Sequence, residues 1–146
     1  MKLLHDAAPP RPRLTAAILT LIALAPAVSA GAQPETARDR AQLFATCEGR
    51  FWAMAARQRA IRAPDAPQSE ARRQTFGTLL EAVIPDVEEA ALATGEARRW
   101  QASGWTEIAY LISDTVYVRD ERRAAQAARQ LTDRLRTCSQ ALLPED

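Results

Sequence analysis

Two cysteines have the clearest covalent chemistry of any side chains in this 146-residue chain. Cys47 and Cys138 stand 91 positions apart. A catalytic redox pair is typically spaced Cys-x-x-Cys, so that one thiol can resolve the other. In an oxidising compartment, an even pair of cysteines usually forms a disulfide. We therefore expect a structural disulfide between Cys47 and Cys138, with a redox couple as the alternative.

The most unusual local sequence is the segment 47–52, Cys-Glu-Gly-Arg-Phe-Trp. Gly49 is unfavourable within a helix, because glycine loses more backbone freedom on folding than any other residue. Some other interaction must offset this cost. One interpretation is a close helix–helix approach beside the disulfide, where any side chain would clash. The alternative is a recognition patch, in which Glu48 and Arg50 flank a groove and Trp52 forms its wall.

Aromatic residues supply the remaining candidates for binding, since aromatic and arginine side chains dominate interaction hot spots. Trp52 and Trp100 fall beside the expected apolar stripes. Together with Arg50 they are candidates for an exposed interaction surface. Trp105 fits an apolar stripe and is predicted to lie in the core. A second hypothesis places an apolar ligand between the helices, near Trp105 and Tyr110.

The composition excludes several classes of function. Residues 31–146 contain no histidine, because His5 is the only one in the chain. Serine–histidine–aspartate catalysis, cysteine–histidine catalysis and histidine-based zinc sites are therefore excluded there. The same residues carry 16 basic and 17 acidic side chains, whereas a nucleic-acid binder needs a basic excess. We predict no catalytic residue, no metal, no cofactor and no nucleic-acid partner.

Residues 1–30 have the pattern of a cleavable secretion signal, in which a basic start precedes an apolar segment and a small-residue cleavage site. The apolar segment covers 14–28, and small residues at 28–30 end it. This pattern predicts cleavage between Ala30 and Gly31 and a periplasmic location. The basic residues of the start are Lys2, Arg11 and Arg13.

A retained membrane anchor is the alternative for the same segment. A transmembrane helix needs about 20 apolar residues to cross the hydrocarbon core of a bilayer. The run over 14–28 has fifteen residues and contains Pro26. We therefore expect cleavage, and no stable membrane span in the mature protein.

Four segments are expected to be helical, because apolar residues recur in each at steps of three and four. Proline or turn residues separate the segments. Gly95 and Gly104 interrupt the third one, and each costs roughly 1 kcal/mol relative to alanine inside a helix. We expect a kink there or two shorter helices, and we expect Asp120 to cap the last helix. The four segments are 35–62, 69–84, 86–117 and 120–143.

Both cysteines fall on the apolar stripes of their own helices. Cys47 lies in the first half of the first helix, and Cys138 lies near the end of the last one. Four helices joined by short turns favour antiparallel neighbours, and in such a bundle the two cysteines lie at similar heights. The sequence therefore predicts a single all-α domain over 31–146, an antiparallel four-helix bundle with a disulfide between its first and last helices.

The element Cys47-Glu48-Gly49-Arg50, followed by Cys138 near the end of a helical chain, resembles a group of small exported bacterial proteins of uncharacterised function. Those proteins carry a Cys-x-Gly-Arg element in an early helix and a second cysteine in the last helix. The resemblance implies a helical fold and a disulfide. It carries no catalytic residues to this chain.

Two functional hypotheses follow from the sequence. The first is an exported, non-enzymatic accessory or protein-interaction protein whose partner is another envelope protein. The second is a periplasmic carrier or sensor that binds an apolar small molecule between its helices. An enzyme is a third hypothesis, and the lack of histidine in residues 31–146 weakens it.

Overall fold

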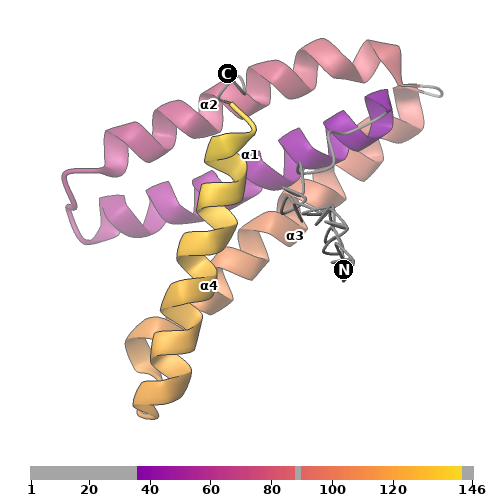
Figure 1. The fold of residues 1–146 in the computed structure, drawn as a ribbon. Coiled ribbons are helices and arrows are strands. Elements are labelled where there is room, and N and C mark those ends of the chain that lie inside the picture. Colours follow the sequence, from indigo (N-terminus) through magenta and orange to yellow (C-terminus); the bar gives the residue numbers. More distant parts are fainter. Residues whose placement is uncertain (1–35, 88–89, 143–146) are drawn as a thin grey trace, which may run out of the picture. The chain divides into compact units, whose positions relative to one another are not determined.

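The computed structural model describes residues 36–87 and 90–142, so the expected secretion signal lies outside the described residues. The described residues all belong to one compact unit, Ala32–Asp146. They form helices and no strand (Figure 1), which confirms the predicted all-α fold. The α-helices are α1 (Ala37–Ala60), α2 (Ala66–Val83), α3 (Ala90–Tyr117) and α4 (Glu121–Gln140), and a short 3₁₀ helix covers Ile84–Asp86.

The first helix is the centre of the bundle, because α1 packs against both α2 and α3. α1 and α3 run in the same direction: Arg38 pairs with Glu96 near their starts, and Arg50 pairs with Glu107 farther along. α2 runs back along α1 after the turn at 61–65. With neighbours on several sides, α1 buries small residues on more than one of its sides. They include Ala41, Ala45, Ala53 and Ala55.

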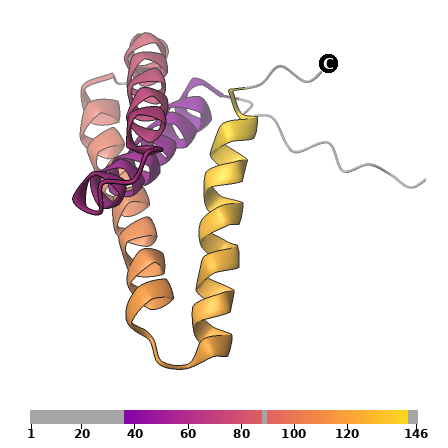
Figure 2. The same ribbon diagram turned by 90° about the vertical axis from the view of Figure 1, so that its left-hand side faces the viewer.

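The last helix packs antiparallel against α3. Asp114 pairs with Arg123 near the turn at 118–120, and Glu107 pairs with Arg134 farther from it. The turn end of this α3–α4 hairpin extends past α1 and α2 (Figure 2). α4 reaches α1 only through its final turns. The helices therefore alternate in direction along the chain, as the sequence predicts.

Local hydrogen bonds fix where the helices begin. The Thr36 hydroxyl accepts a hydrogen bond from the backbone N–H of Asp39 at 3.0 Å, and the Asp39 carboxylate accepts one from the backbone N–H of Thr36 at 3.3 Å. This reciprocal capping box starts α1. The carboxylate of Asp120 accepts from the backbone N–H groups of Arg122 and Arg123. The predicted cap of the last helix is confirmed.

The third helix differs most from its prediction. It begins at Ala90, later than expected, because Pro85 and its neighbours form the 3₁₀ helix. It then continues as one helix through Gly95 and Gly104, so the interpretation as two shorter helices is wrong. At Gly104 the missing Cβ allows backbone contact with α1. Packing of this kind compensates for the low helix propensity of glycine.

Two apolar clusters lie between the helices. In the first, the rings of Phe44 and Phe51 lie 6.3 and 5.9 Å from the ring of Phe76, beside the cysteines. The buried residues of the second cluster are Ala41, Val87 and Ala93.

None of the helices in residues 36–87 and 90–142 is long and apolar enough to cross a membrane.

Candidate functional site

The two cysteines form the predicted disulfide. Cys47 of α1 and Cys138 of α4 are bonded, with their Cα atoms 5.6 Å apart. Both are fully buried, and they share their apolar cluster with Phe51 and Phe76. Burial denies access to an attacking thiolate, which favours a structural over a redox role. A disulfide of this kind fits an oxidising compartment.

Arg50 lies at the junction of α1, α3 and α4. Its side chain is 13% exposed, and its Nη2 lies 2.8 Å from Oε2 of Glu107. Its Nη1 also lies 3.6 Å from Sγ of Cys138. Arg134 of α4 pairs with the other oxygen of Glu107 at 2.7 Å. One carboxylate of α3 thus joins arginines of two other helices, and these contacts give Arg50 a role in holding the helices together.

Glu48 is a buried carboxylate in the segment that the sequence singles out. The residue is 8% exposed, and its Oε1 lies 3.4 Å from Nη1 of Arg73 on α2. Burial raises the pKa of Glu48, while the charge of Arg73 and a hydrogen bond with Gln101 of α3 oppose the rise. A carboxyl with a raised pKa binds its proton more tightly in the folded state. Its stabilising effect is therefore present at acidic pH and is lost as the pH rises through the folded-state pKa.

The backbones of α1 and α3 touch where the helices cross. A Cβ atom built on Gly49 would lie 2.0 Å from the carbonyl oxygen of Gln101, and one built on Gly104 would lie 2.2 Å from that of Thr46. Neither position therefore has room for a side chain. The interpretation of Gly49 as a point of close helix approach is confirmed. The close approach at these two glycines fixes where α1 and α3 cross.

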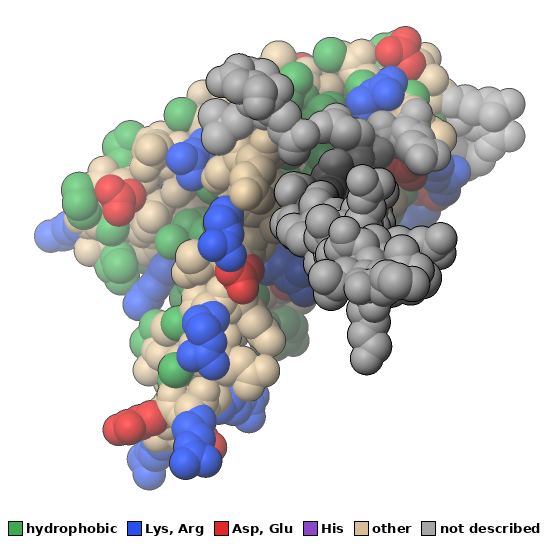
Figure 3. Space-filling model, in the orientation of Figure 1, with side chains coloured by type: hydrophobic (Ala, Val, Ile, Leu, Met, Phe, Trp, Pro, Cys, Tyr) green, Lys and Arg blue, Asp and Glu red, His purple; other side chains and the backbone are tan. Residues whose placement is uncertain are grey.

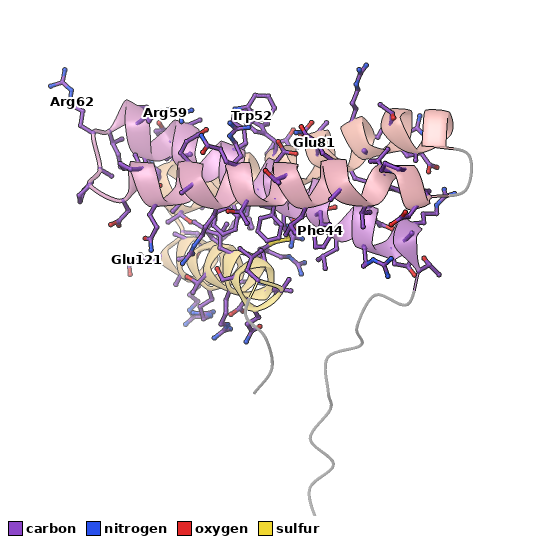
Figure 4. All side chains as sticks on the ribbon, turned by 90° about the horizontal axis from the view of Figure 1, so that it is seen from above. Phe44, Trp52, Arg59, Arg62, Glu81 and Glu121 are labelled. Carbon is purple, nitrogen blue, oxygen red and sulfur yellow. A yellow bond between two sulfur atoms is a disulfide. The ribbon has the colours of Figure 1, made fainter. Side chains whose placement is uncertain are left out.

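Trp52 and Trp105 form an exposed pair beside the crossing. Their ring centroids are 6.5 Å apart in an edge contact, and the residues are 45% and 39% exposed. The prediction that Trp105 lies in the core is wrong, because the buried side of α3 passes through Gly104 and Ile108 instead. Trp52 lies on the side of α1 and α2 away from α4, as does Glu81 (Figure 4). We call Trp52 and Trp105 the tryptophan pair.

The third tryptophan has different surroundings. Trp100 is half-buried and packs against the second apolar cluster. The guanidinium carbon of Arg38 lies 6.0 Å from the centroid of its ring, a cation–π arrangement. The sequence groups Trp52 and Trp100 on one candidate surface. In the structure, Trp52 is joined to Trp105, whereas Trp100 is part of the packing near the starts of α1 and α3.

Tyr110 belongs to a hollow on the surface of α3. The tyrosine is 71% exposed. The hollow has a volume of about 430 Å³. The sequence places a ligand between helices at Trp105 and Tyr110, but here both residues line a depression on a single helix. Its lining residues are Trp105, Thr106, Ala109, Tyr110 and Ser113.

A groove between α2 and α3 is a feature that the sequence did not reveal. It has a volume of about 330 Å³ and lies over the end of α2, the 3₁₀ helix and the first half of α3. Leu80 and Ile84 contribute apolar side chains to one wall, and Ala97 contributes to the other. Arg98 and Glu81 supply the charges of its lining. We call this feature the α2–α3 groove.

In the described part of the chain, no group of three or more histidine, cysteine, aspartate or glutamate side chains is placed to hold a metal ion. Comparison with family models, with curated proteins and with solved structures gives no match to this chain. The features of this chain that bear on its function are the tryptophan pair, the hollow on α3 and the α2–α3 groove.

Proposed function

We propose that this chain is an exported, non-enzymatic accessory protein that binds another envelope protein through the tryptophan pair. One observation carries the proposal: two large rings from different helices contact each other and yet stay 45% and 39% exposed. Aromatic side chains concentrate at interaction surfaces, where they bury a large area with few rotatable bonds. The disulfide and the signal pattern of residues 1–30 support export to the periplasm.

The surroundings of the tryptophan pair support a binding role. Trp105 follows Gly104 directly, and Trp52 lies one turn of α1 beyond Gly49. Both rings therefore project from backbones that are held in contact at the helix crossing. A surface that is already ordered loses less conformational entropy when a partner binds. The pair is thus suited to act as a rigid anchor for a partner protein.

Substitution of the tryptophan pair is expected to weaken partner binding without unfolding the protein. Trp52→Ala and Trp105→Ala should each raise the dissociation constant by at least about tenfold, as expected for a hot-spot aromatic. A photo-crosslinking residue in place of Ala56, one turn of α1 beyond Trp52, is used in the native envelope to identify the partner. Titration of the purified partner against each variant then gives the dissociation constants.

The matched control is Ile61→Ala, which removes a side chain that is 54% exposed just after α1. This variant should bind the partner as tightly as the wild type. All three variants should remain folded, because none of these side chains belongs to the two apolar clusters between the helices. If both tryptophan variants bind with unchanged affinity, the proposed surface is wrong.

A carrier of apolar small molecules is the second candidate, and the α2–α3 groove is the observation that favours it. Its apolar walls suit a hydrocarbon chain, and Arg98 suits a carboxylate at the end of that chain. We expect dodecanoate to bind there and to raise the thermal midpoint as its concentration rises. Thr94→Trp, which fills the groove, should abolish the shift.

The matched control for the carrier hypothesis is Ser113→Trp, which fills the hollow on α3 instead of the groove. Under the groove hypothesis, this variant keeps the full dodecanoate shift. If Ser113→Trp loses the rise in thermal midpoint and Thr94→Trp keeps it, the ligand binds in the hollow beside Trp105 and Tyr110 instead. A wild-type protein that shows no shift would exclude a carrier role for this ligand class.

A further inference from the structure

One face of α3 is exposed over three turns and carries no charge. Thr106, Tyr110, Ser113 and Tyr117 follow each other at steps of four, three and four, which places them in one stripe along the helix. Tyr110 and Tyr117 are 71% and 73% exposed, and Thr106 and Ser113 are exposed as well. We call this stripe, with the adjoining Trp105 and Ala109, the outer face of α3.

The charged residues of this part of α3 all lie elsewhere on the helix. Between residues 100 and 118 they are Glu107 and Asp114. Glu107 is paired with arginines of α1 and α4, and Asp114 is paired with Arg123 of α4. Both carboxylates are therefore turned toward the bundle. The outer face is left uncharged, although a quarter of the residues in the chain are charged.

The contrast with α4 shows that this composition is not general to the surface. Figure 3 shows basic side chains along α4. Arg122 and Arg129 of that helix are both exposed. Depletion of charge together with enrichment in tyrosine and tryptophan distinguishes the core of a protein interface from other surface. A charged occupant would lose its hydration against the outer face without gaining an ion pair. The occupant must therefore itself be uncharged.

We infer that the outer face of α3 binds the same face of a second copy of this chain, in an antiparallel two-fold dimer. The face carries both parts that a self-complementary contact needs: Tyr110 stands out from it, and the hollow of about 430 Å³ opens beside Tyr110. A two-fold axis near Ala109 places the Tyr110 ring of each copy in the hollow of the other. The same axis pairs Thr106 with Ser113, whose small side chains let the two helices approach.

The size of the face sets the expected strength of the dimer. The stripe from Trp105 to Tyr117 is about 18 Å long at 1.5 Å per residue. A single helix face of this length is smaller than the standard specific interface, which buries about 800 Å² per partner. We therefore expect a reversible dimer with a dissociation constant in the micromolar range. Trp105 belongs to both the tryptophan pair and the outer face of α3, so the envelope partner and the second copy would compete for it. Trp52 takes no part in the dimer, and the inference therefore does not rest on the proposed function.

The test is the molecular mass of the oxidised protein by sedimentation equilibrium, over about 1 to 500 µM, which brackets the affinity expected for so small a face. The wild-type mass should rise from one chain to two. Tyr110→Glu and Tyr110→Arg should each stay monomeric, because the two copies place like charges beside the axis. A mixture of the two variants should recover the dimer, because opposite charges then meet.

Matched controls separate this interface from other surfaces. Gln126→Glu and Gln126→Arg make the same charge changes at an exposed position of α4, and both should dimerise like the wild type. A wild-type protein that is monomeric at every concentration overturns the inference, as does a dimer that Tyr110→Glu leaves intact. The dimer and the proposed function fail separately, because Trp52→Ala is expected to lose the envelope partner and to keep the dimer.

Discussion

Replacement of Cys47 by serine is expected to lower the free energy of unfolding by about 4 kcal/mol, one of the two largest effects predicted for this protein. The disulfide closes a loop of 91 positions. On the chain-entropy account, a cross-link over such a distance destabilises the unfolded state by about 4–5 kcal/mol. Urea unfolding of the oxidised wild type and of the variant, followed by circular dichroism, measures the difference.

The effect should be largest in α4, because the disulfide is its covalent tie to α1. Without the bond, the end of α4 is held by Arg50, by Arg72, which donates to Ser139 at 3.0 Å, and by apolar contacts. Backbone amides near Cys138 should therefore exchange with solvent faster than those of α1. Reduced wild type serves as the control and should match the variant. Equal unfolding midpoints for the oxidised wild type and Cys47→Ser would contradict a stabilising role for the bond.

Gly49→Ala is expected to lower the free energy of unfolding by more than about 3 kcal/mol, as overpacking at a buried contact does in its severe cases. The new methyl group would lie 2.0 Å from a backbone oxygen of α3. Backbone cannot rotate away as a flexible side chain can, so α1 and α3 would have to separate. Gly104→Ala meets the carbonyl oxygen of Thr46 at 2.2 Å and should behave in the same way. Thermal and urea unfolding measure both variants.

Gly95→Ala is the matched control, because it makes the same change in the same helix as Gly104→Ala. A Cβ at Gly95 meets no atom within 4 Å. The gain in helix propensity should therefore raise the free energy of unfolding by about 0.5–1 kcal/mol. The three variants together separate helix propensity from the contact at the crossing. Destabilisation of similar size in all three would contradict the steric explanation.

The fold was most predictable where a helix buries one side only. In α4 the apolar residues recur at regular steps, and Asp120 supplies a cap that the structure confirms. The buried residues of α1 were harder to predict, because the helix has neighbours on several sides and its buried residues do not form a single stripe. The polar Gln58 is buried, whereas the apolar Ile61, three positions farther on, is 54% exposed. Apolar periodicity predicts burial well only for a helix with a single buried face, and the central helix α1 is buried on more than one side.

The candidate site was less predictable, because its geometry depends on the helix crossing. Gly104 and Trp105 are neighbours in the sequence, and the pattern alone does not show which of the two faces α1. The backbone contact at Gly104 turns Trp105 outward, next to Trp52. Arg50 likewise meets its carboxylate on α3 only because the helices cross at that height. The α2–α3 groove depends on the spacing between two helices, and neither the sequence of α2 nor that of α3 indicates this spacing.

Joining the first helix to the last also sets the order of events during synthesis. Cys47 leaves the ribosome well before Cys138, and the 91 intervening positions take roughly 5 to 20 s to translate at about 5–20 residues per second. Throughout that time the first cysteine has no partner within the chain. Any bond that Cys47 forms before then is to a thiol of another molecule, and it must be exchanged before the bond to Cys138 can form. Maturation of this protein therefore finishes only when its final turns have emerged.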